Sequence, residues 1–219
     1  MEIDLGLMRE RILDVAEQHF RRIGYQKTSM ADIAACLRMS SANIYRYFPS
    51  RAEIDAAICG RFIERTTRSA DAVARQKAPA HEKIEGLLKL LHEERQKTFI
   101  QEKRVYDLIV AATMENWPVI RAHNDRLTTI IAEIIQEGAE GGTFFVDDAA
   151  TAARSAMNAF MPFYHPVFVA NKVRNTEETG QLHEEQICFI LKALGWSDQR
   201  ICLSVLPPQM RRKTSLPAT

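Results

Sequence analysis

The sequence predicts an all-α protein. Apolar residues recur every three or four positions along most of the chain, which is the spacing of one face of an α-helix. The 219 residues include only 9 Gly and 8 Pro, too few for the frequent turns of a many-stranded β protein. With 46% hydrophobic and 26% charged residues, the composition is that of a globular chain able to bury a core. We therefore expect about nine helices in two domains.

The N-terminal segment begins with an amphipathic helix. Apolar residues between positions 7 and 23 form one stripe, and Gly24 follows as a helix-ending residue. A second helix of about two turns starts near Met30, where Thr28 or Ser29 can serve as the N-cap. A helix this short is not stable alone, so it must pack against its neighbours.

A third short helix follows after a tight link. It covers residues 42–48, with Ser40 or Ser41 as its N-cap and Pro49 as its stop. Residues 50–53 have the pattern of a capping box and open a fourth helix. Two short helices joined by a tight turn and braced by a longer first helix form the helix-turn-helix pattern.

This segment is basic although the whole chain is nearly neutral. The chain has a net charge of +1, whereas residues 18–51 contain six basic residues and one acidic residue, a local charge of +5. The remaining residues are therefore acidic on balance. A basic unit attached to a slightly acidic body is the charge asymmetry of a DNA-binding protein.

The third helix carries side chains that suit DNA. Ile44 and Phe48 lie four positions apart and can face the core, whereas Tyr45 and Arg46 lie off that face. An arginine suits a phosphate or a guanine edge, and short hydroxyl and amide side chains suit phosphates and bases. The alternative is that Tyr45 and Tyr47 pack over the first helix.

Together these motifs resemble the tetracycline-repressor (TetR) family of bacterial regulators. Residues 28–34 carry the family's hydroxyl residues followed by Ile-Ala, and residues 40–51 carry its aromatic-rich Tyr-x-Tyr-Phe run before a basic residue. The similarity covers roughly residues 7–65. It implies a homodimeric, all-helical repressor that binds a palindromic site in double-stranded DNA and releases it when a small effector binds the C-terminal domain.

The resemblance also implies which residues contact DNA. Thr28 matches the family threonine that caps the second helix, and Arg51 matches the basic residue that reaches phosphate. Ala42 allows only an apolar base contact. Arg46 stands where many members have an aromatic residue, and it either adds a contact or extends along the backbone. The DNA-binding residues predicted in this way are Thr28, Ser29, Ser40, Ser41, Ala42, Asn43, Tyr45, Arg46, Tyr47 and Arg51.

The domain organisation follows from the same patterns. Residues 1–50 are assigned to the helix-turn-helix domain, and residues 51–206 to a helical domain for effector binding and dimerisation. Residues 207–219 are expected to be a disordered tail. Breaks near residues 78 and 100 and at 116–118 separate the expected helices, which are 51–76, 81–100, a short helix to about 115, 118–140, 149–164 and 176–194.

The last two predicted helices bear on oligomeric state. Helix 149–164 is rich in alanine, and helix 176–194 has an apolar face. In the family, the last two helices form a four-helix interface with those of a second copy, and these faces fit that role. Burial inside a single monomer would produce the same pattern.

Large side chains near the helix joints are candidates for an effector pocket. Apolar pockets with a few polar groups between helices are the usual small-molecule sites. We expect an apolar or aromatic effector with one or two polar groups. The candidate lining residues are Phe99, Tyr106, Met114, Trp117, Phe160, Phe163, Tyr164 and His165.

Signatures of catalysis, metal binding and membrane insertion are missing. The six His form no HExxH, no Gly-rich phosphate loop or GxSxG is present, and the four Cys form no CxxC pair. The start of the chain does not resemble a signal peptide, and no apolar run approaches the ~20 residues of a membrane span. We expect a cytoplasmic protein that is not an enzyme, with no metal and no cofactor. Two alternatives stay open, a helical small-molecule-binding protein without an operator and an all-helical enzyme.

Overall fold

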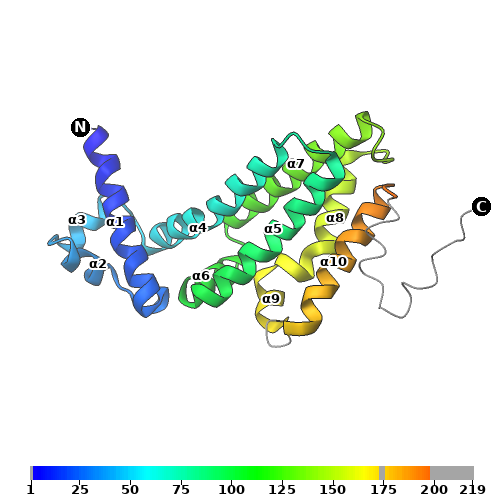
Figure 1. Ribbon diagram of the computed structural model, residues 1–219. Helices are drawn as coiled ribbons and strands as arrows, with labels where there is room; N and C mark the ends of the chain where they lie inside the picture. The colour runs from blue at the N-terminus through cyan, green and yellow to red at the C-terminus, as the bar shows by residue number, and fades with distance from the viewer. Residues whose placement is uncertain (1, 173–175, 198–219) are drawn as a thin grey trace, which may run out of the picture. The chain divides into compact units, whose positions relative to one another are not determined.

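The computed structural model describes residues 2–172 and 176–197 (Figure 1). In these residues all regular structure is helical, which confirms the predicted fold class. The short helix α9 was not expected, and it forms because Pro166 starts a new helix directly after α8. The predicted disorder of residues 207–219 lies outside the described residues. The helices are α1 (Glu2–Ile23), η1 (Tyr25–Lys27), α2 (Met30–Cys36), α3 (Ser41–Tyr45), α4 (Arg51–Ala74), α5 (Ala80–Gln101), α6 (Lys103–Met114), α7 (Pro118–Glu140), α8 (Ala149–Tyr164), α9 (Pro166–Lys172) and α10 (Thr176–Ala193).

The chain divides into two compact units. Unit 1 comprises Met1–Ser69 and Glu93–Leu127, and unit 2 comprises Ala70–His92 and Thr128–Thr219. The division cuts α4, α5 and α7, whereas the sequence had suggested a boundary at residue 50. Unit 1 is larger than a helix-turn-helix because its buried core continues from α1 and α4 into α6 and the start of α7.

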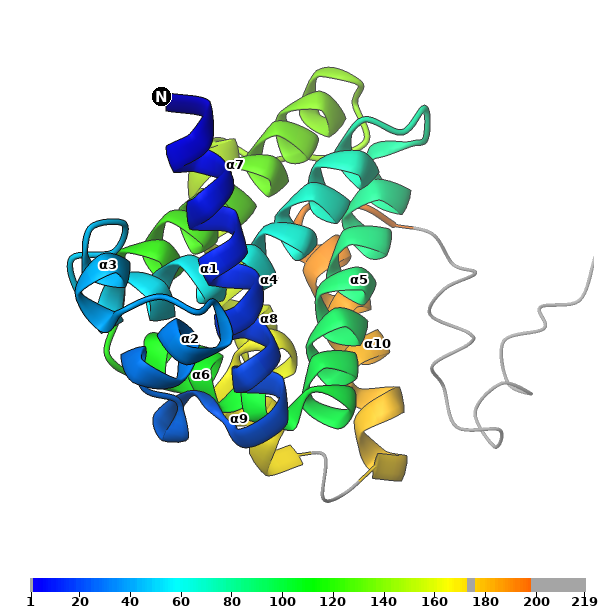
Figure 2. The same ribbon diagram turned by 90° about the vertical axis from the view of Figure 1, so that its left-hand side faces the viewer.

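Unit 1 contains the helix-turn-helix, whose two short helices are α2 and α3. Figures 1 and 2 show α2 and α3 grouped beside α1. Ile33 of α2 and Ile44 of α3 are fully buried, together with Phe48 just after α3 and Phe20 of α1. Helices of seven and five residues have no stability of their own. This apolar core therefore holds them in place.

Unit 2 is a helical core of its own. Buried leucines of α5 and isoleucines of α7 pack in it together with α8 and α10, which lie side by side (Figure 1). Asp148 is the N-cap of α8, since its carboxylate accepts the backbone N–H groups of Ala150 and Thr151. A hydrogen bond from the Thr151 hydroxyl, together with these two backbone bonds, lowers the pKa of Asp148.

A glycine permits the tight turn after α7. Gly138 accepts backbone hydrogen bonds from Thr143 (2.7 Å) and Phe144 (3.1 Å), which fold the chain back over the helix end. A Cβ at position 138 would lie 2.2 Å from the Phe144 ring and 2.8 Å from Ala80 Cβ. Because Phe144 is buried, its ring has little room to retreat.

We predict that Gly138→Ala destabilises the protein by about 1–3 kcal/mol, since the added methyl overpacks a filled core. Gly86→Ala is the matched control. Gly86 also lies within a helix, but its added Cβ would meet only Val73 at 3.9 Å. That change should be neutral or stabilise by up to about 1 kcal/mol, because alanine favours a helix. Urea unfolding of the two variants measures both effects, and equal midpoints would contradict the packing argument.

Candidate nucleic-acid interface and ligand cleft

The N-cap of α2 is Ser29. Its hydroxyl accepts the backbone N–H of Asp32 (3.1 Å), while the Asp32 carboxylate accepts the backbone N–H of Ser29 (2.8 Å). This is a capping box. The Ser29 hydroxyl also donates to the carboxylate, and these bonds lower the pKa of Asp32.

The assignment of Thr28 as the cap of α2 is wrong. Its side chain is only 3% exposed, and its hydroxyl donates to the Gly24 carbonyl (3.0 Å). Thr28 therefore closes the turn that contains η1, one residue before the cap. Its hydroxyl is directed into the protein.

Helix α3 presents two different faces. Ser40 is its N-cap and accepts the backbone N–H of Asn43 (3.2 Å). Ile44 is fully buried, whereas Tyr45 is 47% exposed and Arg46 is also exposed. A helix needs one buried face to be held in place, and the outer face is left for polar and aromatic groups.

The two tyrosines of this region differ in their surroundings. Tyr47 is half-buried and packs against the core of unit 1, as the packing alternative expected of it. Its carbonyl accepts a hydrogen bond from Arg9, whose guanidinium lies 4.1 Å from the centre of the Phe48 ring. Tyr45 has no such packing role among the core residues. Of these two rings, Tyr45 is the one offered to solvent.

The predicted DNA-binding residues thus fall into three groups. Thr28 is buried. Ser41, Asn43, Tyr47 and Arg51 are half-buried. Those left on the exposed surface of unit 1 are Ser29, Ser40, Ala42, Tyr45 and Arg46.

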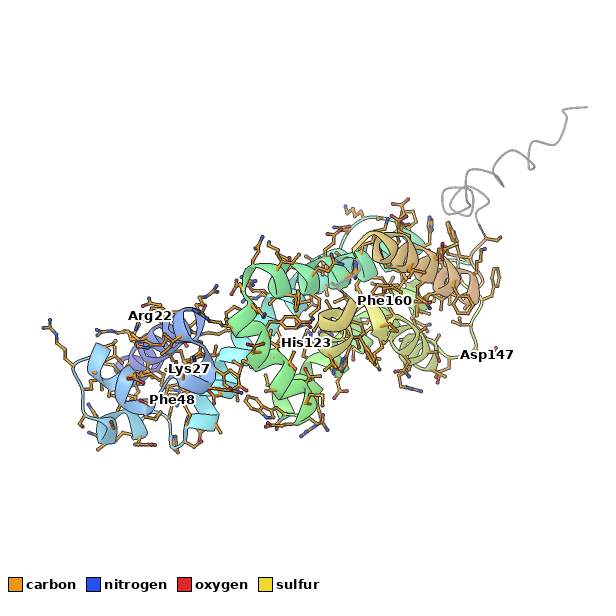
Figure 3. The ribbon with its side chains drawn as sticks, turned by 90° about the horizontal axis from the view of Figure 1, so that it is seen from below. Arg22, Lys27, Phe48, His123, Asp147 and Phe160 are labelled. Atoms are coloured by element: carbon orange, nitrogen blue, oxygen red, sulfur yellow. The ribbon has the colours of Figure 1, made fainter. Side chains whose placement is uncertain are left out.

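Exposed basic residues also occur outside α3. Arg22 lies at the end of α1 and Lys27 in η1, and Figure 3 shows both in the part of unit 1 that contains Phe48. Arg38 is exposed in the turn between α2 and α3 and has a positive φ of 55°. The local excess of basic residues in the sequence is therefore displayed on the surface of the helix-turn-helix.

Arg51 has a different surrounding from the exposed arginines. Its Nε donates to the Asp55 carboxylate (2.8 Å), and its two other nitrogens donate to the carbonyls of Tyr25 (2.6 Å) and Thr28. The guanidinium lies 4.9 Å from the centre of the Phe20 ring. One side chain thus ties the start of α4 to η1 and to the entry of α2. Burial raises the pKa of Asp55, although the Arg51 charge opposes this rise.

We predict that Arg51→Ala destabilises the protein by about 2 kcal/mol, because two carbonyls and a carboxylate lose a charged donor together. Arg51→Lys should recover only part of this loss, since an ammonium group cannot reach all three acceptors as a planar fork does. Arg46→Ala is the control and should stay within about 0.5 kcal/mol of the unmodified protein. Chemical unfolding of the three variants measures this, and equal stabilities for Arg51→Ala and Arg46→Ala would contradict it.

The predicted effector-pocket residues are divided between the two units. In unit 1, Tyr106 is buried and contacts Phe99 with ring centres 5.0 Å apart, and burial raises the pKa of Tyr106 to about 12. Trp117 packs against the core and donates to Glu115 (2.8 Å). Met114 is 69% exposed.

The other predicted pocket residues lie in unit 2. The Phe160 ring is 5.4 Å from that of Phe163 and stacks on Tyr164 at 6.5 Å, and all three side chains are buried. His165 contacts the Phe168 ring at 5.3 Å. The His92 ring contacts this cluster, because its Nδ1 lies 2.8 Å from the carbonyl oxygen of Phe163. The rings of Phe160, Phe163 and Tyr164 thus pack against one another.

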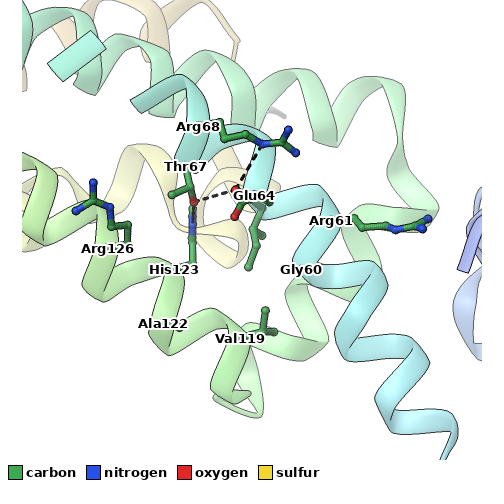
Figure 4. Close-up of a pocket in the computed structure, with 10 residues that line it drawn as sticks. Gly60, Arg61, Glu64, Thr67, Arg68, Val119, Ala122, His123 and Arg126 are labelled. Atoms are coloured by element: carbon green, nitrogen blue, oxygen red, sulfur yellow. Dashed lines mark hydrogen bonds and ion pairs between the residues drawn. The ribbon is translucent and has the colours of Figure 1, made fainter. Parts of the chain in front are cut away.

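A cleft that the sequence analysis missed lies in unit 1 between α4 and α7. It has a volume of about 450 Å³, and the residues that line it include Gly60, Val119 and Ala122 (Figure 4). His123 lines it and is only 6% exposed, and its Nδ1 lies 2.8 Å from the Thr67 hydroxyl oxygen. A signal was present in the sequence, because His123 stands between Ile120 and Leu127 on the apolar stripe of α7.

The environment of His123 keeps its ring neutral. Burial, assisted by the positive charge of Arg95, lowers the pKa of His123 to about 4. The unfolded chain takes up this proton near the ordinary pKa of about 6.5, whereas the folded protein does not. Since the unfolded state binds more protons in that range, the free energy of unfolding falls as pH drops from about 6.5 to 4.

We predict that His123→Asn removes this part of the pH dependence. The variant should be less stable than the unmodified protein at pH 7.5, and the difference should shrink by about 2 kcal/mol at pH 5. Urea unfolding at the two pH values measures the difference. A gap of the same size at both values would show that the folded state does not exclude the proton from His123.

Two further searches concern other kinds of site. In the described part of the chain, no three His, Cys, Asp or Glu side chains come together as a metal site would require. None of its helices combines the length and apolar character needed to cross a bilayer.

A buried-core helix with an exposed polar and aromatic face, preceded by a tight turn and surrounded by basic residues, defines a helix-turn-helix DNA-binding protein. The chain belongs to the tetR family of bacterial regulatory proteins. Residues 12–58 match the profile described as "Bacterial regulatory proteins, tetR family". Residues 80–181 match the profile described as "Tetracyclin repressor-like, C-terminal domain". Members of this family are transcriptional regulators that bind DNA and small molecules.

Solved structures share this fold. A TetR/AcrR regulator from Thermobifida fusca is 23% identical with a TM-score of 0.59, over 84% of this chain and 96% of its own. RolR in complex with resorcinol is 15% identical with a TM-score of 0.63, over 100% and 99% of the two chains. FadR of Thermus thermophilus in complex with lauroyl-CoA is 19% identical with a TM-score of 0.58, over 96% and 100%. No curated protein matches the chain in sequence.

Proposed function

We propose that this regulator is a homodimeric cytoplasmic repressor that binds a palindromic operator and leaves it when a small apolar or aromatic effector binds. The observation that carries the proposal is the division of α3 into a fully buried face at Ile44 and an outer face with Tyr45 and Arg46. A five-residue helix held by its core face, with such groups outside, is suited to a DNA groove.

The DNA contact combines positioning and base recognition. Arg22, Lys27 and Arg46 supply charge for phosphates, which fixes the register of the protein on the duplex. Ser40 and Tyr45 add hydroxyl groups at the same surface, and Ala42 offers a methyl group to a thymine. Thr28 and Arg51 act indirectly in this account, because their polar groups bind backbone carbonyls of the helix-turn-helix itself.

A homodimer through the last two helices is supported by an uncovered apolar surface in unit 2. Phe189 of α10 is 62% exposed and Leu182 is also exposed. Phe189 borders a hollow of about 290 Å³ that small residues of α8 line, among them Ala152 and Ala159. Large exposed apolar side chains beside small ones suit packing against a second copy.

Two-fold symmetry then governs the operator. Two recognition helices of a dimer must meet successive major grooves about 34–36 Å apart, so the site should read the same on both strands. An effector can bind more tightly to a dimer whose recognition helices are spaced differently. It then weakens DNA binding by the difference between its affinities for the two forms of the dimer.

An effector with an apolar or aromatic body fits the family and the chain. Resorcinol in RolR and lauroyl-CoA in FadR both join an apolar part to polar groups. In this chain, the cleft between α4 and α7 combines apolar groups such as Val119 with the polar pair Thr67 and His123. The alternatives, a ligand-binding protein without an operator and a helical enzyme, leave the exposed basic face of unit 1 without a role.

Selection of bound sequences from random duplex DNA tests the proposal. The unmodified protein should enrich a two-fold symmetric site, and its affinity should fall steeply with salt. Arg46→Ala removes one phosphate contact from each half-site, so it should flatten the dependence of log affinity on log salt by about two units for the dimer. Binding that enriches no symmetric site would contradict a dimeric repressor, and no DNA binding would favour the alternative without an operator.

We predict that Phe189→Glu disrupts the dimer, because a charge placed in an apolar interface has no partner there. Light scattering after gel filtration should show about twice the chain mass of 24.9 kDa for the unmodified protein and the single-chain mass for the variant. Glu184→Lys is the control, since Glu184 is exposed on α10 away from Phe189 and should leave the dimer intact. A monomeric unmodified protein, or a dimer that survives Phe189→Glu, would contradict this interface.

A further inference from the structure

We propose that Cys36 is a reactive thiol that forms a covalent adduct with α,β-unsaturated carbonyl compounds, and that His19 is the base for this addition. The site lies in unit 1, where the last residue of α2 contacts α1. It is separate from the cleft between α4 and α7 and does not depend on operator binding. Two side chains carry the inference, one exposed and one buried, whose reactive atoms are in contact.

The first observation is that Cys36 differs from the other cysteines of the described residues. Its side chain is exposed, whereas Cys59 and Cys188 are buried. Burial raises the pKa of the Cys59 thiol to about 12, so this group stays protonated and unreactive at neutral pH. Of these three thiols, Cys36 is therefore the one that a dissolved reagent can reach.

The second observation is the histidine next to the sulfur. Nε2 of His19, in α1, lies 3.1 Å from Sγ of Cys36, within the distance of a hydrogen bond to sulfur. Figure 2 shows α1 and α2 beside each other. When Nε2 carries no proton it accepts the thiol proton, and when it carries one it donates to the sulfur. Either arrangement favours the thiolate, which is the nucleophilic form of cysteine.

Packing alone does not account for His19. Its side chain is only 8% exposed, and its Nδ1 is shielded from solvent with no hydrogen-bond partner in the protein. A buried polar atom without a partner is unfavourable, so an apolar residue would serve stability better at this position. The polar contact that His19 does make is directed at the reactive atom of Cys36.

The surroundings of His19 favour the cation that forms when the ring takes up a proton. Hydrogen bonds from Ser29 and, to a smaller extent, the positive charges of His19 and Arg22 lower the pKa of the Asp32 carboxyl. The attraction is mutual, so the Asp32 carboxylate stabilises a protonated His19, although solvent screens part of the effect because Asp32 is exposed. Burial of the imidazolium is thereby partly compensated.

The addition is balanced without a further reagent. The S–H bond of Cys36 breaks and its proton moves to Nε2 of His19, while the sulfur electron pair forms a bond to the β carbon. The electron pair of the C=C bond shifts to the α carbon, which then takes the proton back from His19. No group leaves, and no oxidant or reductant is consumed. The reaction needs a base that removes one proton and returns it, and His19 lies where it can do both.

The test uses acrylamide with the full chain at neutral pH, and mass spectrometry of the peptides follows each cysteine over time. Cys36 should react at least about five-fold faster in the folded protein than in the guanidinium-unfolded chain, because only folding places the base beside it. An exposed thiol without a base would gain nothing from folding. Equal or slower reaction of Cys36 in the folded protein would overturn the proposal, and so would faster reaction of Cys59 or Cys188.

Two variants locate the base. His19→Asn keeps a polar side chain that cannot take up the proton, so the reaction of Cys36 should slow at least about five-fold. His81→Asn is the matched control, because His81 also has a shielded Nδ1 without a partner but stacks on Trp196 in unit 2. It leaves the pair of Cys36 and His19 intact, so the rate should stay within about two-fold.

Circular dichroism establishes that each variant is folded. An unchanged rate in folded His19→Asn, or equal slowing in His81→Asn, would overturn the assignment of the base. The comparison of folded and unfolded chains needs no variant, so it decides alone if His19→Asn does not fold.

The operator experiment is independent of this one. A protein that selects no symmetric DNA site but shows the fast reaction dependent on His19 would keep the reactive thiol and lose the repressor. A repressor whose Cys36 reacts no faster than in the unfolded chain would lose only the reactive thiol.

Discussion

The helix-turn-helix depends on a core that is larger than itself. Helices α2 and α3 have seven and five residues and cannot persist in water alone. They are held by buried side chains of α1 and α4, and this core continues into α6. Arg51 completes the arrangement by binding two carbonyls at the entry of α2 from the start of α4. The apolar core and the hydrogen bonds of Arg51 together determine where the exposed face of α3 lies.

Helix α4 connects the two candidate sites of unit 1. Its first residue, Arg51, binds backbone carbonyls in the turn before α2, and the Thr67 hydroxyl oxygen, about four turns later, lies 2.8 Å from Nδ1 of His123 in the cleft. A ligand that changes the position of α4 at Thr67 would therefore act on the same helix that supports the DNA-reading face. The physical link is one continuous helix and its packing, so that no separate signalling element is needed.

Much of the fold could be predicted from the sequence, and less of the site. Periodicity and Gly24 were sufficient to locate the helices of the helix-turn-helix, because these signals are local, although α3 ends at Tyr45 and not at Phe48 before Pro49. The hydrogen bonds of the Arg51 guanidinium within the protein could not be predicted, since their acceptors are carbonyls 23 and 26 residues earlier in the chain. The cleft was missed for the same reason, because Thr67 and His123 meet across 56 residues. Large aromatic residues attracted attention as pocket candidates, yet several of them pack on one another.

The central claim is that the outer face of α3 reads DNA while its inner face is held by the core of unit 1. Amide hydrogen exchange of the full chain, with and without a duplex that carries the selected site, tests it most directly. The account predicts slower exchange on DNA binding in residues 28–47, which include the caps and both short helices. Unchanged exchange in these residues together with protection elsewhere in the chain would contradict it.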